Sequence, residues 1–303
     1  MNKLMAYLRL TRPANVVTAV ADILAGIAVS GAALMWFSPD AVSGPSPGLS
    51  SWLWLCLSTI GLYGGGVAFN DVFDAGLDRV ERPERPIPSG MVPLKNAAVM
   101  ASALLLVGIV AGWQVSPLSG WLAIVIAFLC ILYNAWGKHQ LVLGPINMGL
   151  CRTGNLLLGI SIIPEMVQVY WYLGLIPLVY IAAITMISRG EVHGSNRRAL
   201  QGGFAMYVAI VVVLLGLSFT TPVPWWQVIP FLLLLCYMIF PPLLQALNTQ
   251  KPQLIGKAVK AGVISQIVVN SALSSMFAGW QFGVLIVILL PLSLWIARKF
   301  SVT

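Results

Sequence analysis

The amino-acid sequence predicts an all-α membrane protein, a polytopic helical bundle of nine to ten transmembrane helices that forms one domain over residues 1–303. Of its 303 residues, 59% are hydrophobic and only 9% are charged, and the mean hydropathy is +0.90. Soluble domains carry about a quarter charged residues, so the composition argues against a soluble fold. The apolar runs are long and do not alternate in polarity, which argues against a membrane β-barrel.

The predicted spans are runs of about 20 mostly apolar residues, the length that crosses a bilayer as a helix. They cover residues 14–37, 51–70, 97–113, 118–136, 141–163, 169–188, 203–220, 226–247, 255–279 and 281–297. The last two are separated only by Gly279-Trp280-Gln281, which is a kink if there are nine helices and a loop if there are ten. The first run is longer than the apolar core of a signal peptide, so we expect an uncleaved first helix.

The basic residues are sorted between the two sides of the predicted bundle. With ten helices, all the Lys and Arg residues except Arg152 lie on one side, in loops and termini or, for Lys257 and Lys260, at the start of the ninth span, and the opposite loops contain none. The positive-inside rule makes the basic side cytoplasmic, and we expect an integral protein of the cell (inner) membrane. This sorting accounts for the net charge of +8 without a nucleic-acid partner.

After the second predicted span, the stretch FNDVFDAGLDRVERPERPIPSG, residues 69–90, holds five of the nine acidic residues. If the helix continues to about Val80, Asp71, Asp74 and Asp78 lie on one face. Neighbouring carboxylates repel one another unless a cation neutralises them, and Mg²⁺ prefers oxygen ligands, often shared with phosphates. The arginines that follow suit phosphate oxygens.

A solvated loop whose acids and bases pair with each other is the alternative interpretation of this stretch. Ionisable groups at membrane level are costly, however, and favour a functional role. The residues by themselves therefore predict a metal–diphosphate site at the cytoplasmic membrane face.

The same stretch resembles the first signature of the UbiA superfamily of membrane prenyltransferases. The resemblance rests on Asn70-Asp71-x-x-Asp74-x-x-x-Asp78 followed by Arg82-Pro83-x-Arg85-Pro86-Ile87-Pro88-Ser89-Gly90, on Thr11-Arg12-Pro13-x-Asn15, and on the pair Tyr133 and Lys138. It implies that the protein binds an isoprenyl diphosphate through Mg²⁺, ionises it, and transfers the prenyl group to an aromatic or other lipophilic acceptor.

The resemblance also implies roles for individual residues. The metal ligands would be Asn70, Asp71, Asp74, Asp78 and Glu191, and the three aspartates with Glu191 would be catalytic. The diphosphate-binding residues would be Arg79, Arg85, Lys138 and Arg189.

A second acidic motif, D-x-x-x-D in the family, is altered here to Ser188-Arg189-Gly190-Glu191-Val192-His193-Gly194-Ser195-Asn196. Glu191 takes the place of the first aspartate and Ser195 that of the second, and a hydroxyl is a weaker metal ligand than a carboxylate. This variant resembles the divergent UbiA-like branch called EboC. Two functions therefore remain: a prenyltransferase, and a non-catalytic or divergent protein that binds or helps to export a lipophilic metabolite precursor.

Two charged residues lie inside predicted helices, Asp22 in the first and Arg152 in the fifth. A charge at membrane depth is expensive, so we expect them either to pair with each other or to line the substrate cavity. Together with Asn15, they are assigned to acceptor binding.

Overall fold

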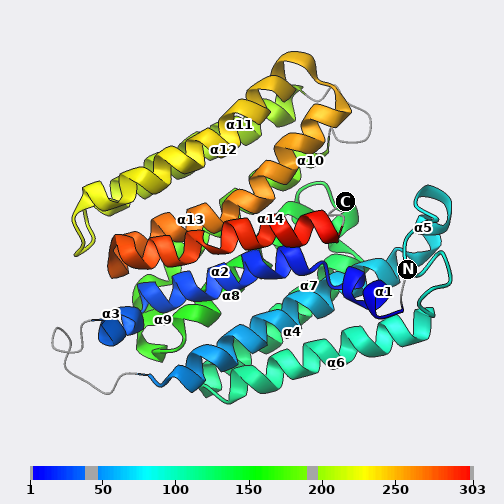
Figure 1. The fold of residues 1–303 in the computed structure, drawn as a ribbon, viewed down its shortest axis with the longest axis horizontal. Helices are drawn as coiled ribbons and strands as arrows, with labels where there is room; N and C mark the ends of the chain where they lie inside the picture. Colours follow the sequence, from blue (N-terminus) through cyan, green and yellow to red (C-terminus); the bar gives the residue numbers. More distant parts are fainter. Residues whose placement is uncertain (1–2, 38–46, 190–196, 301–303) are drawn as a thin grey trace.

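A computed structural model of the protein describes residues 3–37, 47–189 and 197–300. Within these ranges the chain is helical and contains no strand, which confirms the predicted all-α class. Figure 1 shows long helices packed along a shared direction. In chain order the α-helices are α1 (Lys3–Leu10), α2 (Pro13–Val29), α3 (Ala32–Phe37), α4 (Leu49–Phe73), α5 (Ala75–Glu81), α6 (Leu94–Trp113), α7 (Pro117–Ala135), α8 (Leu143–Ile160), α9 (Pro164–Tyr170), α10 (Leu175–Ser188), α11 (Arg197–Ser218), α12 (Ile229–Thr249), α13 (Pro252–Val287) and α14 (Leu289–Lys299), with short 3₁₀ turns at η2 (Gly137–His139), η3 (Trp171–Gly174) and η4 (Trp225–Val228).

The number of membrane-crossing helices depends on how broken and reversing stretches are counted, and the stretch Pro252–Lys299 is counted as one. By length and composition, seven helical stretches in the described ranges can cross a membrane, and eight if α1 and α2, bent by 44°, count as one span. The predicted nine to ten are therefore not confirmed. The first predicted span is divided near Gly31 into α2 and α3, and the fifth, α8, has 18 residues that include Asn147, Arg152 and Asn155.

At Gly279 the chain reverses direction. Its backbone, with φ 82° and ψ 165°, is not helical, and this positive φ suits a residue without a side chain. A Cβ placed on Gly283 would lie 3.0 Å from the carbonyl oxygen of Ser271, whereas twelve residues of continuous helix would separate them by roughly 18 Å. The segment after Gly279 therefore packs back along α13 and leads into α14 (Figure 1).

The central helix of the bundle is α2, which contacts α4, α8, α13 and α14. It approaches α8 closely because glycines face each other there. A Cβ on Gly26 would lie 2.4 Å from the carbonyl oxygen of Leu156, and one on Gly159 would lie 2.4 Å from that of Ile23. Small residues permit such backbone approach between membrane helices. This contact brings the polar groups of α2 and α8 together in the core.

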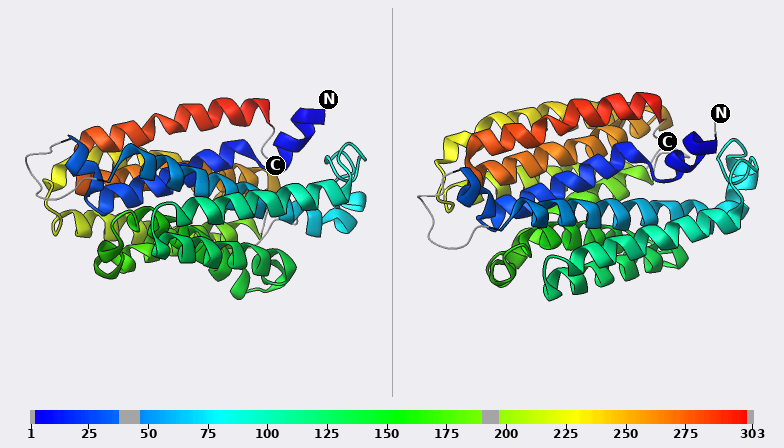
Figure 2. Two further views of the ribbon diagram at one scale, coloured as in Figure 1. Left: turned by 90° about the horizontal axis from the view of Figure 1, so that it is seen from below. Right: turned by 60° about the horizontal axis from the view of Figure 1, so that its bottom comes forward.

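The two ends of the bundle carry different segments. Helix α1, the C-terminal end of α14, α5 and the turn from α12 to α13 lie at one end, and α3, α9 and the turn from α11 to α12 lie at the other (Figures 1 and 2). The first end therefore gathers basic residues that are distant in sequence, such as Arg9, Arg85, Lys251 and Arg298. The chain is an integral membrane protein by its apolar helices. Which side of the membrane the basic end faces stays a prediction.

Candidate functional site

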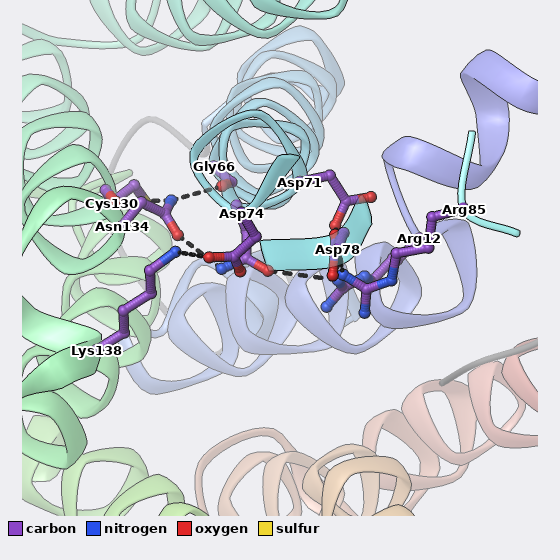
Figure 3. A network of polar contacts seen from close by, with 10 residues as sticks. Arg12, Gly66, Asp71, Asp74, Asp78, Arg85, Cys130, Asn134 and Lys138 are labelled. Atoms are coloured by element: carbon purple, nitrogen blue, oxygen red, sulfur yellow. Dashed lines mark hydrogen bonds and ion pairs between the residues drawn. The ribbon is translucent and has the colours of Figure 1, made fainter. Parts of the chain in front are cut away.

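The site begins where α4 ends. Asp74 has a turn conformation between α4 and α5, with φ −86° and ψ 0°, so the predicted continuous helix to Val80 is interrupted at one residue. Backbone hydrogen bonds still cross the break, from Asp74 N to Asn70 O at 2.9 Å and from Asp78 N to Asp74 O at 2.8 Å. The side chains nevertheless separate. Asp71 and Asp78 face one group of cations, and Asp74 faces another (Figure 3).

On one side, two arginines hold the buried carboxylates. Nη2 of Arg12 lies 3.0 Å from Oδ1 of Asp71, and Nη1 of Arg85 lies 3.6 Å from the same oxygen and 2.7 Å from Oδ2 of Asp78. The side chains of Asp71 and Asp78 are only 9% and 5% exposed. Two buried charges are tolerated at this depth because each carboxylate has a cation and a hydrogen bond.

Local sequence explains how Arg85 reaches this position. Prolines at 83, 86 and 88 prevent α5 from continuing, and the chain folds back in turns closed by hydrogen bonds such as Val92 N to Pro86 O at 3.0 Å. Val92 is fully buried beneath this loop. The loop thereby returns Arg85 to Asp78, seven residues earlier in the chain.

On the other side, Lys138 in η2 pairs through Nζ with Oδ1 of Asp74. A chain of amides runs beside this pair: Nδ2 of Asn70 donates to Oδ1 of Asn134 at 3.0 Å, and Nδ2 of Asn134 donates to the carbonyl oxygen of Gly66 at 2.9 Å. These bonds join α4 to α7 (Figure 3). We call the three aspartates with Arg12, Arg85 and Lys138 the mouth network. It holds three carboxylates and three cations.

Not every predicted site residue joins the mouth network. Arg79 on α5 and Arg189 at the end of α10 are exposed, and within the described ranges neither makes an ion pair. Glu191 lies outside the described residues, as do His193 and Ser195, so the second motif has no described position. The roles assigned to these residues stay predictions.

A cavity of about 210 Å³ opens beside the mouth network. Arg12, Asn70 and Asn134 line it and also belong to the network or its amide chain. Its walls, from α2, α4, α7, α8, α10 and α13, are mostly apolar, with polar groups at Asn15, Thr59, Tyr63, Tyr133, Arg152 and Asn155. Two of the three predicted acceptor-binding residues, Asn15 and Arg152, therefore line the cavity. The third, Asp22, does not line it and is fully buried.

The sequence reasoning did not assign a site role to Arg12, Thr59 or Tyr63. Arg12 has φ 45° and ψ 67°, a left-handed conformation that costs about 1–2 kcal/mol for a non-glycine residue. The feature of the sequence that could have indicated a role for Arg12 is its position as a charged residue directly before Pro13 and the first apolar span. Tyr63 stands seven residues before Asn70, so helical periodicity puts both on one face of α4.

The oxygen atoms at the mouth suit a hard divalent cation. Asn70, Asp71, Asp74 and Asp78 offer amide and carboxylate oxygens, the ligand type that Mg²⁺ prefers. As the side chains stand, no three His, Cys, Asp or Glu residues of the described ranges converge on one point. The aspartates are instead occupied by their cations, which a metal ion would have to displace.

Comparisons with known proteins agree with this geometry. A curated relative, the digeranylgeranylglyceryl phosphate synthase of Ignicoccus hospitalis, is 32% identical over 198 residues, which cover 63% of this chain and 59% of that protein. The synthase of Methanothrix thermoacetophila is 31% identical over 186 residues, or 61% of this chain and 62% of that protein. The matched region thus spans about three-fifths of these relatives.

Solved structures share the fold. A digeranylgeranylglyceryl phosphate synthase structure aligns with a TM-score of 0.64 at 20% identity over 92% of this chain and 99% of that chain. A UbiA homologue from Archaeoglobus fulgidus bound to DMAPP and Mg²⁺ aligns with a TM-score of 0.63 at 14% identity over 88% and 99% of the two chains. At these identities the likeness concerns the fold alone.

The family model described as the UbiA prenyltransferase family matches residues 25–257, well over half of the chain. The match includes α4, α5 and the loop that returns Arg85, which carry the first motif. The finer assignment to the EboC branch stays a prediction. By this match, the chain belongs to the UbiA prenyltransferase family.

Proposed function

We propose that the protein transfers an isoprenyl group from an isoprenyl diphosphate to a lipophilic acceptor, with Mg²⁺ as cofactor. The observation that carries the proposal is the mouth network, in which three carboxylates pair with three cations, one of which, Arg12, also lines an apolar cavity. Family membership supports it, as do relatives named as digeranylgeranylglyceryl phosphate synthases and a homologue structure bound to DMAPP and Mg²⁺.

In this proposal the mouth network exchanges its partners when substrate binds. Asn70, Asp71, Asp74 and Asp78 would hold Mg²⁺, which neutralises charge on the leaving diphosphate. The same event releases Arg12, Arg85 and Lys138 to donate hydrogen bonds to diphosphate oxygens. Metal alone would have to displace the cations, and diphosphate alone would have to attract them away from the aspartates. Binding both together gives the carboxylates and the cations new partners of opposite charge.

The cavity supplies the conditions for transfer. The bond between the prenyl carbon and the diphosphate oxygen breaks with its electron pair on the diphosphate, and the acceptor forms the new bond to that carbon and loses a proton. The prenyl carbon carries positive charge during this step, so water must be kept away. Apolar walls exclude water, and the rings of Tyr63 and Tyr133, which line the cavity, can stabilise the cation through their faces.

A transfer assay tests the proposal. Purified protein would be incubated with labelled isoprenyl diphosphates of several chain lengths, a lipid extract as acceptor source, and Mg²⁺. We expect diphosphate release and a labelled lipid product that both disappear on chelation and in an Asp71→Asn/Asp74→Asn variant. Binding of isoprenyl compounds without turnover, and without any dependence on Mg²⁺, would contradict the proposal and favour the non-catalytic export role.

We also propose that the basic end of the bundle faces the cytoplasm of the cell membrane, because Lys and Arg are retained on that side. Reporter fusions after residues 90, 140 and 303 should all report a cytoplasmic location. A fusion at residue 221, in the turn between α11 and η4, is the matched control and should report the opposite side. Opposite-side signals at 90 and 140 would overturn the orientation.

A further inference from the structure

A second ion pair lies deep in the bundle, away from the mouth. Nη1 of Arg152 on α8 lies 2.9 Å from Oδ2 of Asp22 on α2. Asp22 is 0% exposed, and three amides complete its surroundings: Asn155 donates to Oδ2 at 3.0 Å, Asn270 donates to Oδ1 at 2.7 Å, and Gln266 donates to Oδ1 at 3.4 Å. Two carboxylate oxygens accept about four hydrogen bonds. Three amide donors and the Arg152 guanidinium surround both oxygens of Asp22, and Asp22 does not line the cavity, so it is not presented to a ligand there.

Arg152 faces the cavity from the other side of this pair. It lines the cavity, its Cζ lies 5.4 Å from the centre of the Tyr63 ring, and Nη2 donates to Oγ1 of Thr18 at 2.8 Å. The guanidinium carries five N–H donors, and Nη1, although it lies beside Asp22, makes no hydrogen bond within the described part of the chain, so donors remain for a ligand. Arg152 is thus the cation of an ion pair that has no net charge, and it is the member of the pair that lines the cavity.

Thr59 adds an unused hydroxyl to the same cavity. Its side chain is 0% exposed, and Oγ1 has no hydrogen-bond partner within the described part of the chain. It stands one helical turn before Tyr63 on α4, and both line the cavity. A buried polar group without a partner is costly, so a ligand that hydrogen-bonds to Thr59 would be favoured.

The charge balance in the part of the cavity lined by Arg152 and Thr59 determines which head group of a ligand can bind there. An anion in an apolar interior needs an unmatched cation, and the charge of Arg152 is already matched by Asp22. An uncharged oxygen needs only donors, which Arg152 supplies, and a hydroxyl can also use Thr59 as donor or acceptor.

We propose that this end of the cavity recognises an acceptor with an uncharged hydroxyl head group, an alcohol or a phenol, and disfavours carboxylates and phosphates. Arg152 and Thr59 contact the head group, and Asp22 is the positioning residue that cancels the charge of Arg152. The identification of this ligand as the acceptor rests on the proposed transferase function.

Two matched probes of the same shape test the selectivity: 4-butylphenol, which is neutral, and 4-butylbenzoate, which is an anion at neutral pH. Binding to the full chain in detergent would be measured by calorimetry without Mg²⁺ or diphosphate, with the detergent alone as blank. We expect the wild type to bind the phenol at least about tenfold more tightly. Equal or tighter binding of the benzoate would overturn the proposal.

The variants separate charge cancellation from simple packing. In Asp22→Asn, Arg152 becomes an unmatched cation, so the preference should invert toward the benzoate. In Asp22→Asn/Arg152→Gln, both charges are gone and the preference for the phenol should return. A folded Asp22→Asn protein with an unchanged ratio would contradict the role of Asp22.

Thr59→Val keeps the size of the side chain and the ion pair, so it decides the question even if Asp22→Asn does not fold. It should weaken binding of the phenol by about tenfold and leave that of the benzoate unchanged. An unchanged affinity for the phenol would overturn the proposal. Because no transfer is measured, phenol selectivity can be found in a protein that fails the transfer assay, and an active transferase can lack it.

Discussion

Ion pairs occur at two depths of this bundle, and they differ in how firmly they are held. At the mouth, Asp74 is 21% exposed and Arg12 is 27% exposed, and Asp74 and Asp78 each contact one cation. In the core, Asp22 is fully buried and is contacted by three amide donors and the guanidinium of Arg152, all from α8 and α13. The mouth pairs can therefore exchange partners with a ligand, whereas the core pair is fixed and acts through its net charge of zero.

The largest expected contrast is in stability. Asp22→Ala leaves Arg152 buried without its anion, a loss of about 3–5 kcal/mol in the free energy of unfolding. Asp74→Ala removes a partly exposed pair and should cost about 1 kcal/mol or less. Denaturation of both variants in detergent micelles, followed by circular dichroism, measures the two losses. Equal losses would remove the distinction between the two depths.

The next contrast is in activity, where we expect the mouth variant to lose more than the core variant. Asp71→Asn keeps the shape of the side chain but removes a charge from the proposed metal site, so transfer should fall by about 10²–10³-fold while the protein stays folded. Asn270→Ala is a control in the core, because it removes one donor to Asp22 and touches no mouth residue. It should lower stability more than activity. A folded Asp71→Asn protein with normal transfer would place the metal elsewhere.

A smaller effect separates the cations of the mouth from a nearby arginine. Lys138→Gln removes the partner of Asp74 and should raise the Kd for an isoprenyl diphosphate in the presence of Mg²⁺ by about tenfold or more. Arg79→Gln, on an exposed side chain outside the mouth network, should change it by less than about threefold. Equal losses in the two variants would show that Arg79 reaches the ligand, as the family resemblance implied.

The sequence predicted the helical class and the clustering of the three aspartates at one helix end because both are local, but not the break at Asp74 that turns this side chain away from the other two. A long apolar run indicates a membrane helix, and the spacing of Asp71, Asp74 and Asp78 indicates that they lie at the end of the same helix. The helix count could not be read in the same way. The predicted span 14–37 continues through Gly31, where the backbone breaks, because one glycine barely changes hydropathy. At Gly279 the sequence indicated a break but did not decide between a kink and the reversal that the structure shows.

Tertiary contacts explain the rest of what the sequence could not predict. Arg12 reaches Asp71 across 59 residues, and Asp74 turns toward Lys138 because the helix breaks beside it. Asp22 and Arg152 were expected to pair or to line the cavity. The structure shows that Arg152 does both and Asp22 only the first, a division set by the close approach of α2 to α8 at Gly26 and Gly159.

The exchange of partners at the mouth is the central claim, and coupling between two ligands tests it most directly. The affinity for geranyl diphosphate would be measured by calorimetry with and without Mg²⁺, and that for Mg²⁺ with and without geranyl diphosphate. Because coupling is reciprocal, we predict that each ligand tightens the other by the same factor, at least about tenfold, and that Asp71→Asn/Asp74→Asn abolishes the effect. Independent binding of the two ligands in the wild type, with a factor near one, would contradict the account.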